Sequence, residues 1–191
     1  MKATIPLEIS PSACFLGAVL LLLLPFQWLL SVLLAALLHE AGHLLALHIL
    51  RARVVSIRIG CRGAEISVLP LLHWQELLAA LAGPVSGLLA VFTFPCFPCF
   101  AAAALIQSVW NLLPVYPLDG GRVLRCTLQI LGLERFIRVA EGAALCVMLF
   151  TGTWLFFRRN MGSIPVIFLL CMLIGAVDVK FPCKRKQKGL Q

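Results

Sequence analysis

The chain has 191 residues, of which 61% are hydrophobic and 13% are charged, and its mean hydropathy is +1.01. Roughly a quarter of the residues in soluble globular domains are charged, so this composition excludes that class and predicts a polytopic membrane protein. The net charge is +8, but the basic residues are spread between apolar segments, which argues against a nucleic-acid partner.

Apolar segments predict an all-α membrane protein with about six transmembrane helices, because about 20 apolar residues cross the hydrocarbon core of a bilayer. The predicted spans cover residues 12–25, 27–50, 77–94, 96–113, 139–157 and 161–178. We expect residues 1–191 to form one domain, with a core over about 26–130, accessory spans over 139–178 and a basic tail over 179–191. The first span has no clear cleavage signal before it, so it is expected to be retained.

The basic residues predict the orientation of these spans. With six spans, 14 of the 16 lysines and arginines fall on one side, and only Arg158 and Arg159 fall on the other. By the positive-inside rule the richer side is cytoplasmic, so both termini of this multi-pass protein should face the cytoplasm at a cell membrane. The basic tail is then expected to contact the lipid bilayer.

The first motif, His39-Glu40-Ala41-Gly42-His43, ends an apolar run that has no charged residue from Ile9 to Leu38. Residues four apart lie on one face of a helix, so His39 and His43 can direct imidazole nitrogens at one metal ion. Two neutral imidazoles suit Zn²⁺, and a catalytic zinc site usually adds a third protein ligand and leaves a position for water. The adjacent Glu40 can take the proton of that water, so the motif predicts half of a hydrolytic site.

The segment between spans two and three changes character. Residues 54–59 and 64–68 are rich in β-branched side chains, and Gly60-Cys61-Arg62-Gly63 lies between them. This pattern predicts a small β-hairpin at the membrane edge, with an irregular basic loop as the alternative.

The third ligand is expected from a second motif that begins at Asn111. No charged residue occurs from Leu77 to Leu118, and Asp119 then follows two prolines and precedes Gly120 and Gly121. Charged groups within apolar sequence normally face a partner or a watery cavity, and a zinc ion would be such a partner. The prolines interrupt the helix and the glycines permit close backbone approach, so the chain can point Asp119 inward. The alternative is that Asp119 merely caps the following helix.

Other reactive residues have simpler interpretations. The eight cysteines show no disulfide spacing, and the Cys96/Cys99 pair lacks partners for a second metal or redox site. His48 and His73 are expected to have packing or interfacial roles. Glu141 is a candidate functional acid, although a pair with Arg138 is the favoured expectation.

The two motifs together resemble the site-2 proteases, the intramembrane zinc metalloproteases. The similarity runs over residues 26–130, and the small size and hairpin resemble the branch that contains stage IV sporulation protein FB. The resemblance implies one Zn²⁺ held by His39, His43 and Asp119, with Glu40 activating the water. It also implies that Asn111 orients the substrate or the transition-state oxygen, and that the hairpin offers a strand edge.

The implied function is hydrolysis of peptide bonds in or near the transmembrane segment of a membrane-anchored protein substrate, such as a pro-sigma factor or another tethered regulator. Members of the sporulation branch commonly carry a nucleotide-sensing domain after the last span, and here only a short basic tail is expected to follow. No inserted PDZ domain is expected either. The alternatives are a multi-pass divalent-metal transporter, which would distribute its ligands along a pathway, and a catalytically inactive membrane binding protein.

Overall fold

The computed structural model of the protein describes residues 6–60 and 63–159. Over these residues the helices and strands are β1 (Leu7–Ile9), α1 (Pro11–Leu23), α2 (Phe26–Ile49), β2 (Val54–Gly60), β3 (Gly63–Val68), α3 (His73–Leu89), η1 (Ala90–Thr93), α4 (Pro98–Asn111), α5 (Asp119–Ile130), η2 (Glu134–Phe136) and α6 (Ile137–Arg159). The chain divides into two compact units at Gly142, inside α6. The first unit contains the sheet and α1 to α5.

Helix α2 begins directly after Pro25 and ends where Arg51 adopts a left-handed φ of 53°. Its buried residues recur nearly every fourth position: Leu29, Ser31, Ala35, His39, His43 and Leu47. Positions four apart form a stripe along one helix face. The two histidines therefore continue the face that packs against the rest of the unit.

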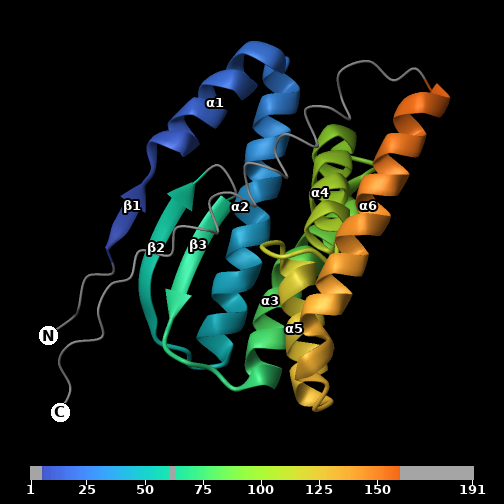
Figure 1. Cartoon of the computed structure of the whole chain (residues 1–191). Coiled ribbons are helices and arrows are strands. Elements are labelled where there is room, and N and C mark those ends of the chain that lie inside the picture. Colours follow the sequence, from blue (N-terminus) through green and yellow to red (C-terminus); the bar gives the residue numbers. More distant parts are fainter. Residues whose placement is uncertain (1–5, 61–62, 160–191) are drawn as a thin grey trace, which may run out of the picture. The chain divides into compact units, whose positions relative to one another are not determined.

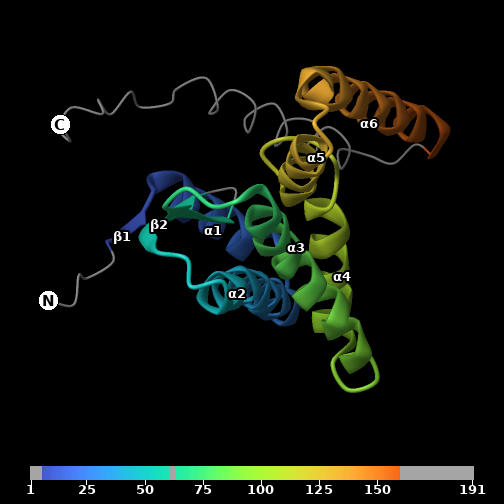
Figure 2. The same cartoon turned by 90° about the horizontal axis from the view of Figure 1, so that it is seen from below.

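The faces that pack against α2 are built from small residues. Helix α3 buries alanines, glycines and Pro84, and α4 buries three alanines and Ser108. Figure 2 shows α3 lying between α2 and α5, in agreement with its close contacts to both helices. Small residues let helix backbones approach closely, which is the packing typical of helices in membranes. Large apolar side chains of α2, among them Leu33 and Leu37, are exposed instead.

The predicted hairpin is present as β2 and β3, which pair antiparallel from Gly60–Gly63 to Val54–Val68. A third strand was not predicted: Leu7–Ile9 forms β1 and pairs parallel with β2. The strand order is therefore β1-β2-β3, and the sheet runs alongside α2 (Figure 1). Strand β2 is the central strand, so among the described residues β1 and β3 each have one open edge.

The predicted spans agree with the helices only in part. Within the described residues, two stretches are long and apolar enough to cross a membrane: Phe26–Ile49 and His73–Thr93. Helices α1 and α4 have 13 and 14 residues, fewer than the roughly 20 that a span perpendicular to the bilayer needs. Helix α5 corresponds to the helix expected after Asp119 and was not predicted as a span, because its polar residues interrupt the apolar pattern. The predicted span over 161–178 and the basic tail lie outside the described residues.

Candidate metal centre

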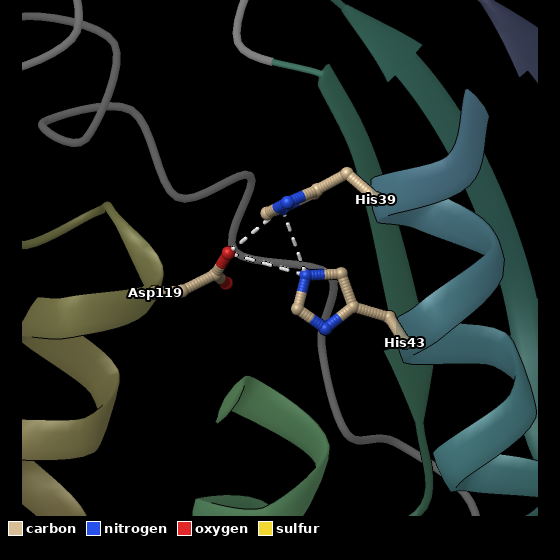
Figure 3. A group of neighbouring side chains, drawn as sticks. All are labelled: His39, His43 and Asp119. Atoms are coloured by element: carbon tan, nitrogen blue, oxygen red, sulfur yellow. Dashed lines mark hydrogen bonds and ion pairs between the residues drawn. The ribbon is translucent and has the colours of Figure 1, made fainter. Parts of the chain in front are cut away.

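Three side chains from two helices converge at one point. His39 and His43 extend from one face of α2, and Asp119 faces them from the first residue of α5 (Figure 3). All three residues are buried, with 3%, 7% and 9% of their surface exposed. Their order in the chain places 75 residues between the second histidine and the aspartate, so only the packing of α5 against α3 and of α3 against α2 brings them together.

Asp119 reaches the histidines because α4 ends at Asn111 and the chain turns back before α5. The backbone of the turn packs directly on the first turn of α5. A Cβ on Gly120 would lie 2.2 Å from the Leu112 carbonyl oxygen, and one on Gly121 would lie 2.4 Å from the Tyr116 nitrogen. The predicted need for glycines after Asp119 thus has a structural cause. Asp119 is not the N-cap of α5, which is Leu118, so the capping alternative does not describe its position.

The three facing atoms form a nearly equilateral triangle. The distances are 3.1 Å between His39 Nε2 and Asp119 Oδ2, 3.1 Å between His43 Nε2 and Asp119 Oδ2, and 3.1 Å between the two Nε2 atoms. Two bonds of about 2.0–2.1 Å at a tetrahedral angle put neighbouring zinc ligands about 3.3 Å apart. The spacing therefore suits one small divalent cation bound by all three atoms.

The hydrogen bond on the far side of His43 supports this interpretation. His43 Nδ1 lies 2.7 Å from the Ala79 carbonyl oxygen. A carbonyl can only accept, so Nδ1 carries the proton, and in the neutral ring Nε2 then presents a bare lone pair. Because Nε2 faces a carboxylate oxygen, either a proton on Nε2 or a cation between the two atoms must join them, and the neutral ring fits the cation. The donor set of two imidazoles and one carboxylate is one that metals such as zinc accept, and the His43 hydrogen bond is the outer support that such ligands usually have.

Helix α3 holds the His43 ring in place. A Cβ on Gly83 would lie 2.2 Å from His43 Nε2, and no rotation of a methyl group relieves such an overlap. The carbonyl of Ala79, one turn earlier, fixes the ring from its Nδ1 side. No role at the site was predicted for Gly83 from the sequence. Ala79 and Gly83 are small residues four apart on an apolar helix, so they lie on one helix face. That spacing was the indication in the sequence that another side chain could pack closely there.

Glu40 follows His39 in α2 and is not one of the three clustered residues. Its Oε1 accepts a hydrogen bond of 3.0 Å from the backbone N–H of Ala64 in β3. Its Oε2 is buried and has no hydrogen-bond partner among the described residues. A carboxylate with one anchored oxygen and one unpaired oxygen next to the His39–His43 face is placed as a general base would be.

The remaining predicted residues lie elsewhere. Asn111 is the last residue of α4, and its side-chain amide donates to the Gln107 carbonyl. Its role in orienting a substrate remains a prediction. His48 and His73 are exposed, and neither belongs to the cluster. Burial raises the pKa of the Cys126 thiol to about 11, so that cysteine stays protonated and acts as a packing residue.

Two arginines that sequence analysis assigned to topology also make contacts. Arg122 lies 3.9 Å from Asp119 Oδ1 and 3.6 Å from Glu76 on α3, so it lies on the carboxylate oxygen that faces away from the histidines. Arg125 forms a 2.8 Å ion pair with Glu141 and lies over the ring of Tyr116. Glu141 was expected to pair with Arg138. The pairing with Arg125 depends on where α6 begins, which the sequence pattern does not reveal.

The comparisons with known proteins bear on the fold. No family model matches the chain, and no curated protein matches it. One solved structure, "Site-2 Protease from Methanocaldococcus jannaschii", is similar over 100% of this chain and 97% of its own, with a TM-score of 0.70 and 18% sequence identity. The resemblance that the two motifs predicted is thus confirmed at the level of the fold: the chain folds as a site-2 protease does.

Proposed function

We propose that this protein is a membrane zinc metalloprotease of the site-2 type, which hydrolyses peptide bonds in or near the transmembrane segment of a membrane-tethered protein. The observation that carries the proposal is the convergence of His39, His43 and Asp119 with Glu40 beside them. The common fold with a site-2 protease supports it. The stage IV sporulation branch and the pro-sigma substrate remain part of the proposal, because neither the fold nor the cluster distinguishes between branches.

A membrane location is supported by where the large side chains point. Helix α2 buries a serine, an alanine, two histidines and two leucines and exposes most of its leucines, and α3 buries alanines and glycines while Leu78 and Leu89 are exposed. Water would penalise such an exposed apolar surface, whereas lipid does not. Two described stretches are also long enough to span a bilayer. The multi-pass arrangement with both termini in the cytoplasm belongs to this proposal.

The roles of the residues follow from the geometry. Zinc bound by His39, His43 and Asp119 would supply Lewis acidity, which lowers the pKa of a coordinated water and polarises a peptide carbonyl. Glu40 would accept the proton of the attacking water and deliver it to the leaving amine. The burial of the three ligands keeps the cluster away from competing solvent.

The substrate must also be unwound, because the peptide bonds of a transmembrane helix are hydrogen-bonded within the helix. An added strand at a sheet edge would replace those hydrogen bonds. The sequence predicted only that the hairpin offers a strand edge. Strand β2 is central, and of the two edge strands β1 has 3 residues and β3 has 6, so we assign strand addition to β3.

The test is co-expression with a membrane-tethered candidate substrate, comparing Glu40→Gln with the parent. A protease loses cleavage in this variant and keeps its zinc, because a glutamine amide cannot take the proton and Glu40 is not a ligand. A metal transporter would keep its metal flux and show no dependence of proteolysis on Glu40. An inactive binding protein would cleave in neither form. Comparing the membrane proteomes of parent and variant cells for an accumulating precursor would then identify the substrate.

A further inference from the structure

The contact between Glu40 and the sheet joins the base of the proposed reaction to the β-hairpin. Ala64 is the second residue of β3, and its N–H donates to Glu40 Oε1 at 3.0 Å. The other oxygen, Oε2, is buried without a partner among the described residues. The two carboxylate oxygens of Glu40 are therefore in different environments, although nothing in the sequence distinguishes them.

The backbone at this point is shaped for the contact. Gly63 has a φ of +104°, which side chains other than glycine rarely permit. A Cβ at Gly63 would lie 2.9 Å from Glu40 Oε1. Gly63 thus brings the start of β3 close enough for the Ala64 N–H to reach the carboxylate.

The Ala64 N–H also belongs to the open edge of the sheet. In an antiparallel pair, the N–H groups of alternate residues point toward the partner strand and away from it. Because Ala64 donates to Glu40 and not to β2, the N–H of Ile66, two residues later, also points outward. The outer edge of β3, to which we assign the substrate strand, therefore begins at the Ala64 N–H that binds Glu40.

We propose that the backbone N–H of Ala64 is a positioning group for Glu40, which fixes Oε1 so that Oε2 is the oxygen that accepts the proton of the attacking water. The role of Oε2 as proton acceptor rests on the proposed proteolytic function, whereas the contact between Ala64 and Glu40 does not. It makes the start of β3 part of the catalytic apparatus. A hairpin displaced from α2 would leave the zinc ligands intact and the base misplaced.

The kinetic test compares two proline variants in the full-length protein. Ala64→Pro removes the outward N–H that holds Glu40, and Ile66→Pro removes the next outward N–H, which Glu40 does not contact. Neither change removes a ladder hydrogen bond to β2. We expect Ala64→Pro to lower kcat about tenfold or more with zinc content and KM nearly unchanged, and Ile66→Pro to raise KM with kcat within about twofold. Equal effects of the two variants on kcat would overturn the proposal.

The second test measures the hydrogen bond between Ala64 and Glu40 and does not depend on catalysis. Amide hydrogen exchange is followed in the parent and in Glu40→Ala, both in detergent and loaded with zinc. We expect exchange at Ala64 to become at least about tenfold faster in the variant, while exchange at Ile66 stays the same. Unchanged exchange at Ala64 would overturn the proposal even if Ala64→Pro failed to fold. If the parent cleaves no substrate, the proposed function fails, and this measurement still decides whether Ala64 holds Glu40.

Discussion

The imidazole of His43 lies directly against Gly83 of α3: a Cβ at this position would stand 2.2 Å from Nε2, the atom that faces His39 and Asp119. The ring can occupy this position only because the neighbouring helix has no side chain there. The position of the proposed ligand atom Nε2 therefore depends on how α3 packs against α2.

Replacing Gly83 with alanine should therefore displace the His43 ring and weaken metal binding. Loss of outer support alone typically costs 10- to 100-fold in metal affinity, and we expect at least about 100-fold here because the ring itself must move. The measurement is zinc affinity by competition with a chromophoric chelator. Gly17→Ala in α1, where an added Cβ meets nothing within 4 Å, is the matched control and should leave the affinity unchanged. A Gly83→Ala protein that binds zinc like the parent would show that His43 is not a ligand in this position.

Removing the metal should lower stability by an amount that depends on zinc concentration. A ligand at 100 times its Kd stabilises the native state by about 2.7 kcal/mol. We expect the thermal midpoint to fall with chelator and to recover on adding zinc. In Asp119→Ala the recovery should be lost, because the carboxylate that faces both imidazoles at 3.1 Å is gone. Full recovery in that variant would exclude Asp119 as the third ligand.

Glu141 should contribute to stability and not to the metal centre. Its pair with Arg125, at 2.8 Å, has side chains that are 21% and 39% exposed, so solvent screens it in part. A double-mutant cycle with Glu141→Gln and Arg125→Gln should give a coupling of about 0.2–1 kcal/mol. Zinc content should remain at the parent's level in Glu141→Gln. Loss of zinc or of proteolysis in that variant would show that Glu141 has a functional role.

The proposed orientation in the membrane can be tested with single cysteines. Cys96, in the connection between η1 and α4, is exposed, and the positive-inside argument puts it outside the cytoplasm. Ser67 in β3 is exposed as well and should lie on the cytoplasmic side. In a protein that otherwise lacks cysteine, a membrane-impermeant maleimide should label Cys96 in intact cells. It should label Ser67→Cys only after permeabilisation. The reverse pattern would invert the topology.

Much of the metal centre was determined by local sequence. The i, i+4 spacing of His39 and His43 places both rings on one helix face in any fold, because it depends only on helix geometry. The prolines and glycines around Asp119 likewise forced a break in the helix and a close turn, and the alternation of β-branched residues predicted β2 and β3. These features arise from the backbone preferences of neighbouring residues, so the sequence alone revealed them.

Tertiary structure decided everything that depends on distant partners. The parallel strand β1 was missed because three residues carry too little pattern to predict a strand, and its pairing with β2 makes β2 the central strand, with β1 and β3 at the edges. The Gly83 cradle, the Ala79 hydrogen bond and the Ala64 contact with Glu40 join residues 24 to 40 positions apart. Such contacts result from how α3 and the sheet pack on α2, and packing depends on the shapes of all the surfaces involved. The sequence thus determined the types of the three clustered side chains and the helix that carries the two histidines, and only the packed structure determined which oxygen of Glu40 has no hydrogen-bond partner among the described residues.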